Sequence, residues 1–314
     1  MSYVNTAVCP LTRGEKFTLT ALADAFMACY KGQDAQTATR IAFFLTHLGN
    51  KAACEIDADD VEDALEALKT RGRLFNRGGS KRGGEIILTH KPLADATINR
   101  YRCGLQALLT WARKKRLMPK GWSNPVNETQ RMPEDNARTR YLNEQEYQRL
   151  LTASRVSYWP MLTLLIMLAV TTGARKGTLM GLKWKDVDLK EGRASCARTK
   201  NGEPFILVLM PDVIAEFKRF HNKSQAEDLV FCGRRADKPM NFEKAWKNAL
   251  NNAAIDGACF HTLRHTHASW LARRGAPLLA IADSLGHKSL AMTKRYSHLC
   301  VDTRAEMLNR VFGA

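Results

Sequence analysis

The sequence lacks the features of a membrane-spanning or secreted protein. No apolar run approaches the ~18 residues that a transmembrane helix needs. The longest, MLTLLIMLAV at 161–170, has the length of a buried helix. The first residues, MSYVNTAVCPLTRGEK, contain no charged segment followed by an apolar one, as a secretory leader would. No basic stretch pairs with a strongly apolar helix face. We therefore expect a cytoplasmic protein without a membrane partner.

Paired cysteines and nucleotide-binding loops are also missing. The eight cysteines are scattered and no CxxC occurs, which predicts reduced thiols rather than a disulfide framework. No Gly-rich phosphate-binding loop is present, so we expect no nucleotide cofactor. The chain also has no internal repeat and no low-complexity segment.

Acidic side chains are few compared with basic ones. Lys and Arg number 48 and Asp and Glu 31 in 314 residues, a net charge of +17. Residues 1–137 hold 20 basic and 15 acidic side chains, whereas residues 138–314 hold 28 and 16. Such an excess favours an anionic partner, with nucleic acid ahead of an anionic membrane or an acidic protein. The C-terminal part is the more cationic.

The apolar pattern predicts two helical domains. Apolar residues at three- and four-residue spacing predict helices over 17–70. A Gly-rich, charged stretch then predicts a loop at 71–85. The segment DATINRYRCGLQALLTWARKKR predicts an amphipathic helix, whose basic residues such as Arg102 form a solvated face. Two prolines and no periodicity predict a linker next. We expect an N-terminal tail at 1–16, a helical domain at 17–120, a linker at 121–138 and a second domain with a C-terminal helix at 139–314.

The second domain combines a buried helix with one β-hairpin. WPMLTLLIMLAVTTGARKGTLMGLKW predicts a buried helix that stops at Gly173, followed by a second helix. RASCARTKNGEPFILVLM predicts a hairpin, because Asn-Gly suits a two-residue turn in which both positions need positive φ. Lys200 then lies at the hairpin tip, where a long side chain can swing toward a neighbouring site. Taken alone, it is an ordinary exposed turn lysine.

Cationic and aromatic side chains gather near the C-terminus. HTLRHTHASW (261–270) and GHKSLAMTKRYSH (286–298) contain His261, Arg264, His265, His267, His287, Lys294, Arg295 and Tyr296. Burying such a group together is costly unless an anion lies among them. His261 and Arg264, three residues apart, share a helix face. No glutamate follows His261 as in zinc hydrolases, and an arginine repels a divalent cation, so we expect no metal.

These motifs together resemble the catalytic domain of tyrosine recombinases of the phage integrase and Xer type. TTGARKGTLMGLKWKDVDL, a hairpin lysine, HTLRHTHASWL and LGHKSLAMTKRYSHL follow the family's order and usual distances over about 140–305. More loosely, TINRYRCGLQALLTWARKKRL is similar to the last helix of the family's core-DNA-binding domain. The resemblance implies a mainly α fold with a small antiparallel β-hairpin or sheet, in which a helical core-DNA-binding domain precedes a catalytic domain of the DNA breaking-rejoining fold.

The resemblance also implies a set of site residues. Arg175 matches the first catalytic arginine, Lys200 the hairpin lysine that protonates the leaving 5′-oxygen, His261 and Arg264 the His-x-x-Arg pair, His287 the Leu-Gly-His histidine, and Tyr296 the nucleophile. His261 is then expected to accept the phenol proton, because an imidazole titrates nearer neutrality than a phenol. Thr178 departs from the acidic residue that many relatives have there, which would slow catalysis without removing a reacting group.

The implied activity is site-specific DNA recombination through a covalent 3′-phosphotyrosine intermediate, without metal or ATP, as in a phage or mobile-element integrase. The implied partners are double-stranded DNA, sister protomers in a tetramer on two duplexes, and accessory DNA-bending proteins. The C-terminal helix, anchored by Met307, Leu308 and Val311, either packs on its own domain or is exchanged between protomers. The setting would be a bacterial cell, its nucleoid or a phage-infected host.

Two other functions stay open at this point. One is a relaxing activity like that of type IB topoisomerases, which uses the same chemistry without strand exchange. The other is a catalytically silent DNA-binding regulator on the same scaffold. The presence of all six site residues argues against the regulator, because a protein that only binds DNA has no need of a nucleophile and a general acid.

Overall fold

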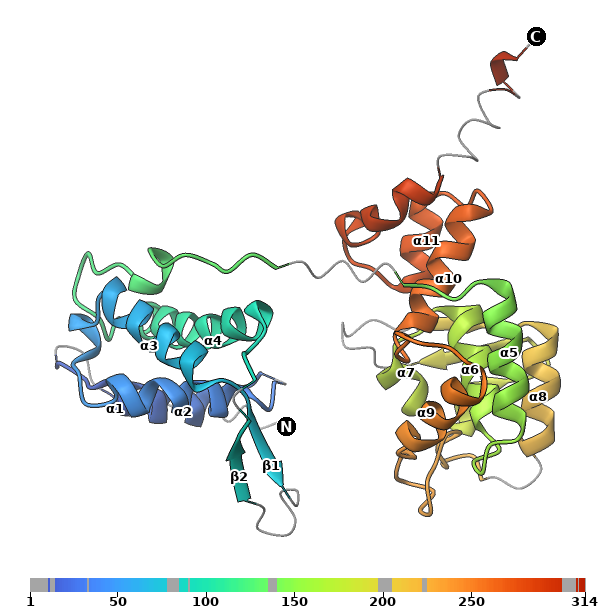
Figure 1. The fold of residues 1–314 in the computed structure, drawn as a ribbon, viewed down its shortest axis with the longest axis horizontal. Helices are drawn as coiled ribbons and strands as arrows, with labels where there is room; N and C mark the ends of the chain where they lie inside the picture. Colours follow the sequence, from blue (N-terminus) through green and yellow to red (C-terminus); the bar gives the residue numbers. More distant parts are fainter. Residues whose placement is uncertain are drawn as a thin grey trace, which may run out of the picture. The chain divides into compact units, whose positions relative to one another are not determined.

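The structure is a computed structural model, which describes residues 11, 15–32, 34–77, 85–89, 91–134, 140–196, 205–221, 225–300, 309 and 311–313. The chain divides into two compact units, Met1–Asn136 and Ala137–Ala314 (Figure 1). Each unit has a hydrophobic core of its own. Both are mainly helical and the second contains a small antiparallel sheet, which confirms the predicted fold class. None of the helices in these ranges is long and apolar enough to cross a bilayer.

Helices α1 and α3 of the N-terminal unit begin where the sequence supplies capping side chains. Thr18 accepts a hydrogen bond from the Ala21 N–H ahead of α1, and Asp57 and Asp60 form a reciprocal capping box ahead of α3. The elements are α1 (Leu19–Cys29), α2 (Thr37–Leu48), η1 (Ala53–Glu55), α3 (Ala58–Arg71), β1 (Leu74–Arg77), β2 (Glu85–Leu88), α4 (Asp95–Lys114) and η3 (Pro125–Asn127).

Helix α4 organises the core of this unit. It is the predicted amphipathic helix, and its buried face includes Leu105, Leu108 and Leu109. Arg102, predicted to lie on a solvated face, instead donates hydrogen bonds to the Val126 carbonyl and to Thr129 Oγ1, the latter at 2.8 Å. A guanidinium can lie on a packed surface when neighbouring oxygens satisfy its N–H groups, so Arg102 ties α4 to η3.

Two segments predicted to be irregular contain ordered structure. In the predicted loop 71–85, Leu74–Arg77 forms β1, which pairs antiparallel with β2 from Leu74↔Leu88 to Arg77↔Glu85. In the predicted linker 121–138, Val126 is buried and the Asn99 side chain bonds both the N–H and the carbonyl of Met132. Side-chain hydrogen bonds replace periodic apolar packing there, so the pattern was not visible in the sequence. Residues 78–84 and 135–139 lie outside the described ranges.

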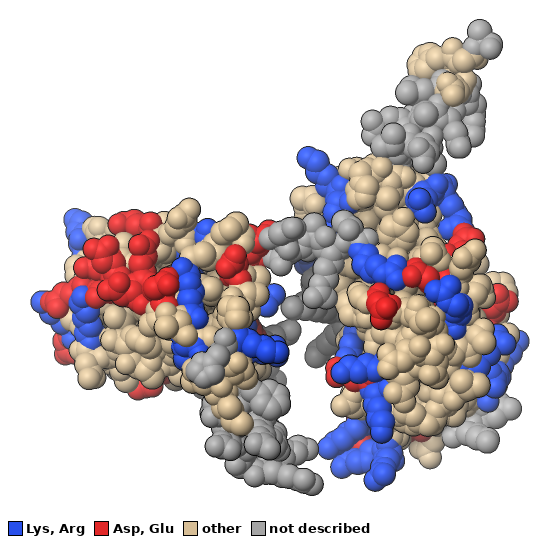
Figure 2. Space-filling view, viewed as in Figure 1, with Lys and Arg blue, Asp and Glu red and all other residues tan. Residues whose placement is uncertain are grey.

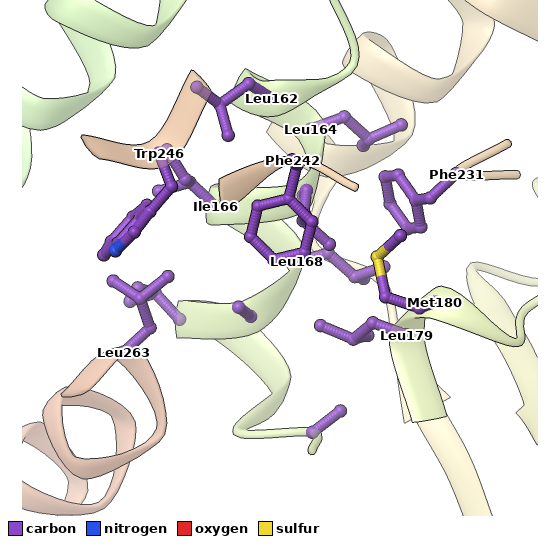
Figure 3. Close-up of a cluster of buried hydrophobic side chains, with 14 of the residues drawn as sticks. Leu162, Leu164, Ile166, Leu168, Leu179, Met180, Phe231, Phe242, Trp246 and Leu263 are labelled. Carbon is purple, nitrogen blue, oxygen red and sulfur yellow. The ribbon is translucent and has the colours of Figure 1, made fainter. Parts of the chain in front are cut away.

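Helix α6 (Leu162–Thr172) is the centre of the C-terminal unit. It is buried on almost all sides, as expected for a helix that is apolar all round. Phe231, Phe242 and Trp246 lie around its leucines in Figure 3. It stops at Gly173, which has φ +63°, as the sequence predicted. Its main neighbours are α5 (Glu144–Arg155), α7 (Lys176–Met180), α8 (Pro211–His221) and α10 (Thr262–Arg273). The unit also contains η4 (Trp184–Asp186), α9 (Glu243–Asn252), α11 (Leu278–Leu285), η5 (Leu290–Met292) and η6 (Lys294–Cys300).

The sheet of the C-terminal unit contains the two strands predicted for the hairpin. Its order is β3 (Val187–Asp188), β4 (Arg193–Cys196), β5 (Phe205–Val208), all antiparallel. Strands β4 and β5 pair from Arg193↔Val208 to Cys196↔Phe205. The connection at 197–204, which contains Lys200 and the predicted Asn-Gly turn, lies outside the described residues.

We expect Phe231→Ala to lower the free energy of unfolding of the C-terminal unit by about 3–5 kcal/mol, because the ring is fully buried and its removal leaves a cavity. Urea unfolding followed by circular dichroism measures the change. Tyr158→Ala is the matched control: that ring is 57% exposed, and we expect a change within about 0.5 kcal/mol. Equal effects of the two substitutions would show that the core is not where the structure puts it.

Candidate active site

Helix α10 buries polar side chains that most helices turn toward water. Arg264, His265, Thr266, His267 and Ser269 are all buried. Buried polar groups need hydrogen-bond partners, and His267 shows how neighbouring helices supply them. Its ring nitrogens lie 2.8 Å from the Val170 carbonyl oxygen on α6 and 2.6 Å from Ser284 Oγ on α11. His267 therefore holds α10 between these two helices.

The Arg264 guanidinium lies where two helices end. It donates hydrogen bonds of 2.7 Å to the carbonyl oxygens of Gly173 and Leu285, at the C-terminal ends of α6 and α11. These carbonyls carry the partial negative charge of the helix dipoles. Within the described ranges no carboxylate pairs with Arg264, so a buried cation is held by neutral groups alone.

Gly173 makes this arrangement possible. Its φ of +63° suits glycine, and a Cβ atom there would lie 2.6 Å from Cδ2 of His267. The close approach lets the chain turn directly under α10, and the turn directs the Gly173 carbonyl at Arg264. The helix stop predicted from the sequence is thus also part of the arginine's support.

Arg175 lies on the same side of the unit as Arg264. It is the N-cap residue of α7, it is half-buried, and its Nη2 lies 3.5 Å from the Gly286 carbonyl oxygen, next to the Leu285 carbonyl that Arg264 uses. The pKa of Arg264 is lowered to about 10, first by burial and then by the charge of Arg175. Two guanidiniums therefore share one region of strong positive potential.

The Tyr296 hydroxyl lies against α10. The side chain projects from η6 and is 6% exposed, and its Oη is 2.7 Å from Nδ1 of His265. Burial raises the pKa of Tyr296, while the nearby cations Arg295 and Arg264 oppose that rise. The phenol thus contacts His265 of its own chain, lies within the electrostatic influence of Arg264 and Arg295, and is neutral at pH 7.

Two further histidines border the same region. His261, the N-cap of α10, is exposed, and its ring centroid is 4.8 Å from that of His265. His287 follows the Gly286 turn, with Nδ1 2.8 Å from Thr293 Oγ1. Burial lowers the pKa of both histidines, that of His287 to about 4, and the cations Arg264, Arg175 and Arg295 lower each further.

Five of the predicted site residues therefore come together in one region. They are Arg175, His261, Arg264, His287 and Tyr296. Lys200 lies outside the described residues. Thr178, which departs from the family pattern, is half-buried on α7. The described part of the chain holds no group of three or more His, Cys, Asp or Glu side chains able to bind a metal ion.

Sequence reasoning missed two partners in this region. His265 was noticed as part of a cationic cluster but given no role, and the structure places it on the Tyr296 hydroxyl. Thr293 was not noticed, although it is fully buried beside His287. The spacing of three residues between Thr293 and Tyr296 was the available signal, since it puts both on one face of a short helical segment.

Comparison with solved structures identifies the fold. The Tn1549 transposon integrase, solved in complex with transposon right end DNA, superposes with a TM-score of 0.69 at 16% identity, over 94% of this chain and 99% of that one. A lambda integrase dimer bound to a COC′ core site superposes with a TM-score of 0.65 at 19% identity, over 90% of this chain and 95% of that one. At such identities the likeness concerns the fold, which is that of tyrosine recombinase integrases.

Sequence comparison then identifies the family. The integrase of Salmonella phage P22 is 24% identical over 298 residues, 88% of this chain and 75% of the relative. Tyrosine recombinase XerA of Saccharolobus solfataricus is 24% identical over 269 residues, which are 84% of this chain and 81% of the relative. Residues 140–302 match the model of the phage integrase family. The chain belongs to the phage integrase family.

The depressed histidine pKa values make stability depend on pH. The pKa values of His265 and His287 fall from 6.5 to about 4 on folding. Between those values the unfolded chain binds more protons than the folded one, so the free energy of unfolding decreases as pH falls from about 6.5 toward 4. We expect urea unfolding to show this loss, with a shallower pH slope for His287→Asn. A free energy of unfolding that stays constant between pH 7 and 5 would contradict the assignment.

Proposed function

We propose that this protein is a site-specific DNA recombinase that breaks and rejoins DNA through a covalent 3′-phosphotyrosine intermediate. The observation that carries the proposal is the Tyr296 hydroxyl, buried against α10 beside Arg264. A phenol near the Arg264 guanidinium, which lacks a carboxylate partner in the described ranges, suits attack on an anion. The family and the fold shared with DNA-bound integrases make that anion a DNA phosphodiester.

The two arginines are suited to the transition state of this reaction. Attack of a tyrosine on a phosphodiester develops negative charge on the non-bridging oxygens. Arg175 and Arg264 each offer a planar, cationic fork of N–H donors, and His287 offers one more donor. Arg264 is already oriented by two carbonyls, so these donors need little rearrangement when DNA binds.

The covalent intermediate removes the need for an external energy source. Tyr296 replaces the 5′-oxygen at phosphorus, and Lys200 is assigned as the acid that protonates that leaving oxygen. The phosphotyrosine bond retains the free energy of the broken phosphodiester, so a 5′-hydroxyl can reseal the strand. This sequence of steps uses neither a metal ion nor ATP.

Duplex DNA is the proposed substrate for both units. The net charge of +17 supports binding through backbone phosphates, which makes affinity strongly salt-dependent. On the face drawn in Figure 2, Lys and Arg spread over the C-terminal unit, whereas acidic side chains gather on the N-terminal unit over α3, where Asp59, Glu62, Asp63 and Glu66 are exposed. We propose that 17–120 acts as the core-DNA-binding domain through surfaces away from α3, and 139–314 as the catalytic domain.

Recombination requires that several protomers assemble on DNA. We propose a tetramer on two duplexes, with the C-terminal helix exchanged between protomers and accessory DNA-bending proteins assisting. The exposed tail side chains Val311 and Phe312, at 63% and 79%, support the exchange because they offer apolar surface to a neighbour. The protein would act in the bacterial compartment that holds the DNA.

A nicked suicide substrate tests the proposed chemistry. Cleavage next to the nick releases a short fragment, so the covalent complex accumulates and is detected as a shifted band on a denaturing gel. We expect the wild-type chain to form this adduct and Tyr296→Phe to abolish it without changing DNA affinity. A wild-type chain that binds DNA and forms no adduct would instead be a regulator. Relaxation of supercoils without strand exchange would indicate a topoisomerase-like activity.

Arg175→Ala tests the role of the first arginine with little risk to the fold. Its hydrogen bond to the Gly286 carbonyl is long, at 3.5 Å, so we expect stability to change little. The rate of adduct formation should fall about 10²–10³-fold, the usual effect of losing one preorganised donor. Lys176→Ala is the matched control. The Lys176 side chain, the neighbouring charge on α7, is 51% exposed and pairs with Glu243, so we expect its removal to change the rate only a few-fold. Equal effects of both substitutions would assign Arg175 to general DNA binding.

A further inference from the structure

We propose that His267 is a positioning residue, which holds Arg264 in the place from which it contacts the DNA phosphate. The inference rests on the proposed function and deepens it, because it names a residue that acts through one of the two arginines. His267 and Arg264 are three residues apart on α10 and both are buried, so they lie on one side of that helix. On that side both side chains contact α11 and the C-terminal end of α6.

The Val170 carbonyl fixes how the His267 ring is protonated. Its oxygen lies 2.8 Å from Nδ1, and a carbonyl oxygen can only accept, so Nδ1 carries a proton and donates it. Burial lowers the pKa of His267, so the ring is neutral at pH 7 and Nε2 has no proton. Ser284 Oγ, 2.6 Å from Nε2, therefore donates to it.

His267 supplies a donor that the end of α6 lacks. The helical partner of the Val170 carbonyl would be the Ala174 N–H, but that N–H bonds Thr172 Oγ1 instead, at 3.3 Å. The last carbonyls of a helix need partners from elsewhere. His267 serves Val170 in this way, and Arg264 serves the carbonyl three residues later.

The two side chains tie together the same pair of helices. Arg264 joins the Gly173 and Leu285 carbonyls, each at 2.7 Å. His267 joins α6 three residues before Gly173 to Ser284, the residue before Leu285. The His267 ring therefore helps to set the separation of the two carbonyls that hold the guanidinium. Without that spacing Arg264 keeps its charge but loses its orientation.

The ring also packs against the backbone of Gly173. A Cβ atom at that position would lie 2.6 Å from Cδ2 of His267, so a movement of the ring is passed to the carbonyl that Arg264 uses. Both ring nitrogens of His267 are occupied by α6 and α11. His267 thus has no polar atom left for DNA, and its effect on the reaction goes through Arg264.

His267→Phe keeps a ring and removes both hydrogen bonds. We expect its rate of adduct formation at saturating nicked DNA to be about 10–10²-fold lower, the scale of a small misplacement of a reacting group. The DNA concentration that gives half the maximal rate should change less than two-fold, because backbone contacts elsewhere supply most of the affinity. A rate within three-fold of wild type would overturn the proposal.

Ser284→Ala is a milder variant that tests the same contact from α11. It leaves Nε2 without its donor, and we expect a rate about 3–10-fold lower than wild type. The double variant with His267→Phe should be no slower than His267→Phe alone, because one contact is lost only once. Rate losses that multiply in the double variant would contradict a path through Ser284.

Thr266→Val is the matched control for a buried hydrogen-bond loss on α10. Thr266 is fully buried, and its hydroxyl bonds the Thr262 carbonyl and the Leu142 N–H rather than α6 or α11. We expect a lower melting temperature and a rate within a few-fold of wild type. If Thr266→Val is as slow as His267→Phe at equal loss of melting temperature, the effect is one of stability and the proposal fails.

Nitrogen-15 NMR of the DNA-free protein gives a readout that does not depend on activity. We expect the His267 proton on Nδ1, and Arg264 side-chain N–H groups that exchange slowly with solvent because two carbonyls hold them. Exchange at Arg264 should become faster in His267→Phe and stay unchanged in Thr266→Val. A proton on Nε2, or Arg264 exchange that His267→Phe leaves unchanged, would overturn the proposal.

The two proposals fail in different ways. If the wild-type chain forms the adduct and His267→Phe forms it equally fast, only the role of His267 is wrong. If the wild-type chain binds DNA and forms no adduct, the proposed function is wrong, and the role of His267 in the reaction falls with it.

Discussion

The structure of the site depends on the hydrogen bonds from Arg264 to the Gly173 and Leu285 carbonyls. Burying a guanidinium is costly, and here the cost is offset by two helix C-termini whose orphan carbonyls also need donors. One interaction thus satisfies the ends of α6 and α11 and orients a cation that has no carboxylate partner in the described ranges. Both helix ends use left-handed glycines, Gly173 and Gly286, because that turn exposes the last carbonyls. The same turn also positions Arg175, which approaches the Gly286 carbonyl next to the Leu285 carbonyl that Arg264 uses.

The surrounding ionisable groups complement this buried cation. The histidines on α10 and after α11 have lowered pKa values, so they are neutral at pH 7 and add no charge to the two arginines. Tyr296, with a raised pKa, keeps its proton. In the free protein the Tyr296 phenol therefore keeps its proton, and Arg264 has no carboxylate partner within the described ranges. Under the proposed function, a DNA phosphate bound here would offset the positive charge of Arg264 and Arg175.

The N-terminal unit shows where sequence patterns work and where they fail. Periodic apolar residues predicted α4 with its buried face, because the interior of a helical unit accepts only that spacing. The packing of Arg102 on Val126 and Thr129 had no such signal. It depends on which polar atoms face each other once the chain folds. The same holds for Asn99 and Met132, whose hydrogen bonds order a segment that reads as a linker.

For the site, the sequence alone determined the residue types, their order and the family pattern, because motif spacing survives in the chain itself. It determined the helix stop at Gly173 for the same reason, since a local turn needs only local residues. Only the tertiary structure decided that His265 rather than His261 contacts the tyrosine. The two lie one turn apart on α10, and the choice depends on how η6, about thirty residues later, packs against that helix. Such long-range contacts come from packing between elements, and no spacing within one element records them.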